Sequence, residues 1–222
     1  MVCHFRPWEV NDPRSRIGCL VLLLKKLPST FAETRATPFL TTEIYRKHQP
    51  RAITHAWTAC TVYHARKPAT ESWAMRVVYE GVAALLRNPP LPVSQDPDAY
   101  TASGHVNTQH LLERLASVQA LILYQTIRCF TGDALLSNSA ARDCETLLDW
   151  ALELTKLRNK MDDDLGGTAT VTICGRSIQQ KPPPSWEDWL IIESTRRTIV
   201  QAFLVVAIAS ILRNSDRESL WP

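Results

Sequence analysis

Apolar side chains recur with the spacing of an α-helix along most of the chain after residue 50. The first such set is Ile53, Ala56, Trp57, Cys60 and Tyr63. These residues share one face of a helix that ends before Pro68. A second set follows Thr70 and consists of Met75, Val78, Tyr79, Val82 and Leu86. The proline-rich stretch 88–92 then ends the second predicted helix.

Three longer helices are predicted in the rest of the chain. The first covers about residues 108–130, and its centre at 121–123 is apolar on all sides, which favours a central position in the fold. The next continues to about residue 159. The last covers 185–212 and begins at Ser185, a favoured N-cap residue that follows three prolines.

Two long polar segments connect these helices. Residues 88–107 are rich in proline and aspartate, and residues 160–184 contain two adjacent glycines and the three prolines. A short strand is conceivable at 171–174, and no other strand pattern stands out. The chain therefore predicts an all-α fold, a bundle-like array of five or six helices with two long loops.

The N-terminal part is harder to interpret. Residues 17–27 form an apolar segment that ends at Pro28 and fits either a short buried helix or a strand. Residues 1–16 have no hydrophobic period, and we expect them to be irregular. We expect residues 17–222 to form a single helical domain that is truncated at its C-terminal end.

Composition excludes several classes of protein. Of 222 residues, 45% are hydrophobic and 21% are charged, as in a globular protein. The net charge of +3 and the dispersed basic residues give no electrostatic stripe for nucleic acid, so we expect no direct DNA binding. The apolar runs at 17–24 and 202–212 are shorter than the roughly 20 residues that cross a bilayer, so we expect no membrane contact.

The six cysteines do not predict a metal site. No C-x-x-C pair is present, and structural zinc sites usually contain one. Cys60, Cys129 and Cys144 lie in helical patterns, where a free cysteine packs as a small apolar residue. We therefore expect reduced thiols.

The last predicted helix carries charges within an apolar stripe. One face of this helix combines Trp186, Trp189, Val200, Phe203, Leu204 and Ala207. Glu193 and Arg196 fall on the same face. Because a buried charge without a partner costs several kcal/mol, we expect Glu193, Arg196 and Arg197 to form a structural polar network inside the packed face.

Several segments together resemble the regulatory region of fungal zinc binuclear cluster transcription factors, the fungal-specific transcription factor domain. Residues 19–28, CLVLLLKKLP, and 37–40, TPFL, resemble an apolar segment of that family and its following turn. Residues 115–130, LASVQALILYQTIRCF, resemble its "LLAVQALLLYQ" helix. The motif from Trp186 to Trp189 and residues 193–198, ESTRRT, resemble its "WxxWxxxESxRRT" helix.

The resemblance covers about residues 17–212 in the family's order, and it implies a helical regulatory module. Family members also carry a cluster of six cysteines that binds two zinc ions and reads DNA, and that spacing is absent from this sequence. DNA binding is therefore not carried over. The resemblance implies a role in transcription regulation, a nuclear location with the cytoplasm as the alternative, and a possible link to secondary metabolism.

Candidate catalytic and metal sites are few. Asp162, Asp163 and Asp164 resemble the magnesium-binding aspartates of terpene cyclases, but they follow a predicted helix end and precede two glycines, which favours a solvated loop. A Cys–His dyad would need His105 or His110 to meet Cys129 or Cys144 through the fold. The sequence also lacks nucleophile-elbow, phosphate-loop, dinucleotide and H-E-x-x-H motifs. We expect no catalytic residue, no metal site and no cofactor.

Three functions remain open on these observations. The first is a non-enzymatic regulatory module that acts through a protein partner or a homodimer, or by sensing a small-molecule ligand. The alternative is a small helical enzyme or ligand-binding protein of secondary metabolism. The third is a truncated gene product without an independent role.

Overall fold

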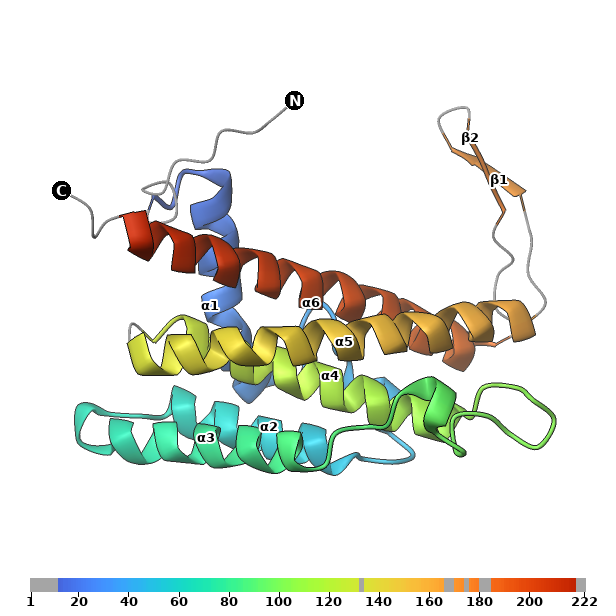
Figure 1. Cartoon of the computed structure of the whole chain (residues 1–222), viewed down its shortest axis with the longest axis horizontal. Coiled ribbons are helices and arrows are strands. Elements are labelled where there is room, and N and C mark those ends of the chain that lie inside the picture. The colour runs from blue at the N-terminus through green and yellow to red at the C-terminus, as the bar shows by residue number, and fades with distance from the viewer. Residues whose placement is uncertain (1–11, 132–133, 166–169, 174–175, 180–184, 219–222) are drawn as a thin grey trace.

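Six α-helices contain most of the residues that the computed structural model describes, which are 12–131, 134–165, 170–173, 176–179 and 185–218 (Figure 1). The predicted all-α array with two long connections is confirmed. Most of the N-terminal segment expected to be irregular lies outside the described residues. The same is true of Cys3, Cys174 and the three prolines before Ser185.

The apolar segment near the N-terminus is a helix, α1 (Arg16–Thr34), and not a strand. Gly18 N donates to Ser15 Oγ at 2.8 Å and so caps its first turn. The prediction that this element stops at Pro28 is wrong. Pro28 removes one helical hydrogen bond, but burial of apolar neighbours on both sides, Leu24, Leu27 and Phe31, keeps the helix continuous.

The two predicted helices of the middle region are present as α2 (Arg51–His64) and α3 (Glu71–Arg87). They pack on each other and are joined through a single 3-10 turn, η3 (Pro68–Thr70). Another 3-10 turn, η2 (Thr42–Tyr45), precedes α2, and a third, η4 (Val93–Gln95), lies in the connection before α4.

Helix α4 (Thr108–Cys129) lies at the centre of the array. It packs on α2 and α3 on one side and on α5 and α6 on the other, and α1 crosses it (Figure 1). Leu121, Ile122 and Leu123 are fully buried, which confirms the central position that their apolar surroundings predicted.

Helix α5 (Ala134–Asp164) runs five residues beyond its predicted end at residue 159 and contains the three consecutive aspartates. The second long connection carries a small antiparallel hairpin, β1 (Thr170–Ile173) and β2 (Arg176–Gln179). Figure 1 shows this hairpin standing apart from the helices. The short strand considered at 171–174 overlaps β1, and two strands leave the fold class unchanged.

Helix α6 (Trp186–Glu218) packs through a different face from the predicted one. Trp186, Trp189, Val200 and Phe203 are exposed. The buried face consists of Ile191, Ser194, Thr195, Thr198, Ala202, Val205 and Ile208. Through this face of small side chains and hydroxyl groups α6 packs on α4 and α5.

By length and composition alone, one segment among the described residues could cross a membrane. It is Trp186–Leu212 of α6, with a mean hydropathy of 1.5. The same segment packs along α4 and α5 and carries Glu193, Arg196 and Arg197 near its middle. A core helix of a water-soluble protein meets the same criterion when it is mostly buried, whereas 28% of the apolar window of this helix is buried.

Candidate functional site

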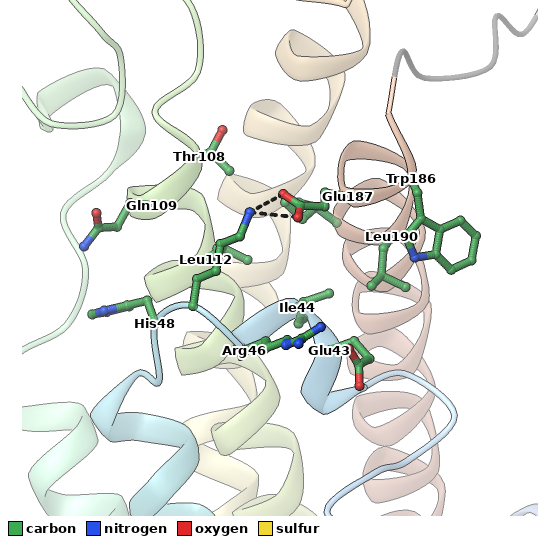
Figure 2. A pocket seen from close by; sticks show the side chains of 12 residues that line it. Glu43, Ile44, Arg46, His48, Thr108, Gln109, Leu112, Trp186, Glu187 and Leu190 are labelled. Atoms are coloured by element: carbon green, nitrogen blue, oxygen red, sulfur yellow. Dashed lines mark hydrogen bonds and ion pairs between the residues drawn. The ribbon is translucent and has the colours of Figure 1, made fainter.

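A pocket lies where α4 and α6 begin, next to the turn η2. Its volume is about 720 Å³, within the range of small-molecule sites. Its walls come from residues 43–48, from the first turns of α4 and from the first turns of α6 (Figure 2). Side chains far apart in the sequence therefore form one cavity.

Two N-cap residues fix the α4 and α6 walls of this pocket. At the start of α4, His110 N donates to Asn107 Oδ1 at 3.4 Å. At the start of α6, Asp188 N donates to Ser185 Oγ at 3.1 Å, and the Ser185 hydroxyl donates to Asp188 Oδ2 at 2.6 Å. The predicted N-cap role of Ser185 is confirmed. Capped helix ends hold Thr108, Gln109 and Trp186 at fixed positions on the pocket wall.

The inner surface of the pocket is mainly aliphatic. Ile44 and Ile191 are buried, while Leu112 and Leu190 are partly exposed toward the cavity. Trp186 forms part of the α6 wall, and its ring stacks on that of Trp189 with centroids 4.8 Å apart and planes 19° apart. Both indoles remain exposed, at 69% and 40%. An exposed pair of stacked tryptophans is a feature of binding surfaces more than of packed cores.

Charged groups surround the opening. Lys47 Nζ donates to both carboxylate oxygens of Glu187 at 2.7 Å, and this ion pair, drawn as dashed lines in Figure 2, joins the segment that follows η2 to α6. On the α4 side, His48 Nε2 lies 2.5 Å from Glu113 Oε1. The guanidinium of Arg46 and the carboxylate of Glu43 make no hydrogen bond or ion pair with any residue that the structure describes. The opening therefore holds cations and carboxylates in about equal number.

A buried polar cluster lies behind the pocket and connects its three walls. Tyr45 Oη donates to Gln119 Oε1 at 2.7 Å. The Gln119 amide nitrogen lies 3.0 Å from Phe39 O, 3.2 Å from Ser194 Oγ and 3.0 Å from Thr198 Oγ1. Its two hydrogens can serve two of these three acceptors at once. Ser194 Oγ and Thr198 Oγ1 also donate to Phe39 O.

Along the chain, residues of this polar cluster are close neighbours of residues that line the pocket, so the cluster links the pocket wall to the core. Tyr45 follows directly on Ile44 of the wall, and Ser194 lies one turn beyond Ile191. Burial raises the pKa of Tyr45 well above its usual value, so its hydroxyl stays protonated and available as a donor. A displacement of residues 43–48 would therefore strain hydrogen bonds inside the core.

The residues predicted to form a polar network are bonded to one another, but not in the interior. Arg196 donates to both carboxylate oxygens of Glu193 at 2.8 Å, and Arg197 Nε donates to Glu193 Oε1 at 2.6 Å. Arg197 also reaches Pro38 O at 3.3 Å. The expectation that Arg196 is buried is wrong, since both arginines are about half exposed. Glu193 is 20% exposed, so its carboxylate is partly buried while the two guanidinium groups that pair with it face water.

Hydrogen bonds from Arg196, and then from Arg197, lower the pKa of Glu193 to about 2. A carboxyl with a depressed pKa stabilises the fold above its unfolded pKa, and this contribution is lost as the pH falls through the folded value. Glu193→Gln should lower the free energy of unfolding by no more than about 1 kcal/mol at pH 7, because the arginines are solvated. Denaturation titrations at several pH values should show this difference shrinking between pH 5 and 2.

The exposed Glu145 on α5 supplies a matched control, since Glu145→Gln should leave the stability curve unchanged. A difference for Glu193→Gln that stays constant down to pH 2 would contradict the ion-pair origin of the effect.

The three aspartates lie on the last turn of α5, not in a loop after it as predicted. Arg158 pairs with Asp162 at 2.7 Å, and Lys160 pairs with Asp164 at 2.5 Å. Val106 N also donates to Asp164 Oδ2 at 2.9 Å. Asp162 and Asp164 thus have protein partners, and the described part of the chain contains no group of three or more metal-ligating side chains. The geometry gives no support to a magnesium-dependent cyclase site.

The histidines and thiols do not form the dyad considered from the sequence. His110 Nε2 lies 2.8 Å from Asp96, and His105 lies 3.6 Å from Asp164. Burial raises the pKa of Cys129 to about 12, the opposite of what a nucleophilic thiol requires. His110 thus faces a carboxylate of the 88–107 connection, and His105 faces a carboxylate at the end of α5.

Sequence reasoning missed the pocket and the polar cluster behind it. One signal for the polar cluster was present in the sequence. Gln119 interrupts an apolar helix, and a buried amide needs hydrogen-bond partners. The sequence gives no signal for the aliphatic wall of the pocket, because the residues of this wall come from three distant segments.

Comparison with known proteins gives one similarity over most of the chain. The chain is 26% identical over 201 residues to the transcription factor gsfR2 of Penicillium aethiopicum. The match covers 90% of this chain and 43% of the length of that protein. No family model matches, and no solved structure matches. The chain is similar to a fungal transcription factor along nine-tenths of its length.

Proposed function

We propose that this chain is a non-enzymatic regulatory module of a fungal transcription regulator and works in the nucleus. The observation that carries this proposal is the similarity to the transcription factor gsfR2 over 201 residues. Because the chain spans less than half the length of that protein, the role of the whole relative is not transferred. What is transferred is a part in regulating transcription.

The pocket supports a binding role more than a catalytic one. Its acidic and basic side chains stand at a solvated opening, where Lys47 and Glu187 neutralise each other. Thr108 is the one hydroxyl residue in the wall, and it is bonded to no base among the described residues. Efficient acid–base or nucleophilic catalysis needs a reactive group held against a base in a site that excludes water.

The module would respond to a small molecule in the pocket or to a protein partner on its surface. Dispersed basic residues give no groove for DNA, so we propose that contact with a promoter depends on a DNA-binding protein or domain. The polar cluster of Tyr45, Gln119, Ser194 and Thr198 provides a route by which an event at the pocket alters helix packing.

A fusion of the chain to a heterologous DNA-binding domain should change expression of a matching reporter gene by at least about threefold relative to that domain alone. The physical reason is that a regulatory module acts through contacts that survive transfer to a new DNA-binding domain. Reporter activity and fusion protein level are measured together, so that expression differences are removed.

A fusion that carries Gln119→Leu, which disrupts the core, is the matched control and should lose the effect. A folded fusion that leaves the reporter at the level of the DNA-binding domain alone would contradict the proposed function.

A further inference from the structure

We propose that the pocket at the start of α4 and α6 binds a planar aromatic molecule that carries an acidic group. This inference deepens the proposed function by naming the chemical class of the ligand. It depends on three properties of the site: its aliphatic interior, the tryptophan at its edge and the weakly held ion pair at its opening.

The interior suits a ring system of drug-like size. About 720 Å³ is available, and Ile44, Leu112, Leu190 and Ile191 present aliphatic surface to it. Each apolar group that the ligand buries contributes roughly 25 cal/mol per Å² removed from water. The neighbouring Trp186, stacked on Trp189 and therefore already ordered, adds aromatic surface at a small entropic cost.

The opening can accept an acid because Lys47 is held by a replaceable partner. Lys47 and Glu187 are 80% and 69% exposed, and an ion pair this solvated contributes little to stability. Glu187 lies in the first turn of α6, where the positive end of the helix dipole stabilises a carboxylate that has lost its lysine. A ligand acid can therefore replace Glu187 as the partner of Lys47.

A second cation stands beside Lys47. Arg46 is exposed at the opening, and its guanidinium is bonded to no described residue. Glu43 on the same turn opposes an acidic ligand. The pocket thus prefers an acidic ligand only because that ligand can displace Glu187 from Lys47. Removing the charge of Lys47 should therefore weaken binding of an acidic ligand, and removing the charge of Glu187 should strengthen it.

Two fluorescent probes with the same ring system test this inference on the full chain. They are 8-anilino-1-naphthalenesulfonate, which carries an acid, and N-phenyl-1-naphthylamine, which does not. Lys47→Gln should weaken binding of the sulfonate probe about three- to fivefold, and Glu187→Gln should strengthen it by a similar factor. Neither change should alter the affinity of the neutral probe by more than about twofold.

Two further variants locate the binding. Leu190→Gln, in the aliphatic wall, should weaken both probes, whereas Lys26→Gln on the exposed side of α1 should affect neither. If the sulfonate probe binds the same to wild type, Lys47→Gln and Leu190→Gln, it lies elsewhere, for example on exposed Val200 and Phe203, and the inference is overturned. It is also overturned if Glu187→Gln weakens the sulfonate probe.

The probe experiment and the reporter fusion fail independently. Absence of probe binding with an active fusion would refute the ligand class and leave the regulatory proposal in place. If the sulfonate probe binds with the predicted charge dependence but the fusion is inactive, the regulatory proposal is refuted and the ligand class stands.

Discussion

Gln119→Leu should lower the free energy of unfolding by about 2–4 kcal/mol, because it removes the central member of a fully buried hydrogen-bonded cluster. Tyr45 Oη would lose its acceptor inside the core, and Ser194 and Thr198 would lose a donor. Leucine has a similar volume, so the loss would come from unpaired polar groups and not from a cavity. Urea denaturation followed by tryptophan fluorescence measures this change.

Gln95→Leu is the matched control, since Gln95 is exposed on η4 and should change stability by less than about 0.5 kcal/mol. Ser194→Ala should have a smaller effect than Gln119→Leu, because Gln119 keeps Phe39 O and Thr198 as partners. If Gln119→Leu is as stable as the wild type, the cluster does not hold α4, α6 and η2 together.

Arg114→Leu should cost about 3 kcal/mol or more, because Arg114 is a buried cation that ties the 88–107 connection to α4. Its guanidinium donates to Leu91 O, to Asp96 Oδ2 at 2.5 Å and to His110 Nε2 at 2.8 Å. Removing it leaves the Asp96 carboxylate, itself 7% exposed, without its main partner. Thermal and chemical denaturation both measure the loss.

The pH dependence distinguishes this ion pair from simple packing. Burial alone would raise the pKa of Asp96, but hydrogen bonds from Arg114 and the Asp98 amide outweigh it and lower the pKa below its usual value. The pair therefore stabilises the fold above the unfolded pKa of about 3.9, and this contribution disappears as the pH falls through the folded value. The difference in free energy of unfolding between the wild type and Arg114→Leu should accordingly become smaller at low pH.

Arg76→Leu provides the comparison, since Arg76 makes only an exposed ion pair with Glu80 on α3 and should cost no more than about 0.5 kcal/mol. Arg114→Lys should rescue Arg114→Leu only in part, because an ammonium cannot reproduce the forked geometry of three simultaneous bonds. A full rescue by lysine would show that charge alone matters at this position.

Helical periodicity predicted the elements of this fold well, and it failed at α6 for a physical reason. In α2 and α3 one face is apolar and the other polar, so most of the buried side can be read directly, although Tyr79 of the predicted α3 set is 56% exposed. Helix α6 carries bulky apolar residues outside its packed face, such as Trp186, Val200 and Phe203, and the packed face itself uses Ser194, Thr195, Thr198 and Ala202. Hydropathy gives these small and hydroxyl-bearing residues little weight, although they form the face that packs on α4 and α5.

The sequence pattern could not predict the candidate site, and the reason is a different one. Its wall requires that η2 lie beside the first turns of both α4 and α6, and no local signal specifies that arrangement. Trp186 and Trp189 were assigned to a packed face, whereas both are exposed and Trp186 lies at the pocket edge. The Glu193–Arg196 pair was predicted correctly as a contact and wrongly as a buried one.

Because α1, α2, α3, α5 and α6 all pack on α4, the order of synthesis limits when this fold can form. Helices α1 to α3 leave the ribosome before the helix that covers their apolar faces, and residues 88–107 must follow before α4 emerges. Until then, side chains such as Phe31, Val78 and Val82 have no completed core. The nascent N-terminal half is thus the stage at which chaperone binding would matter most.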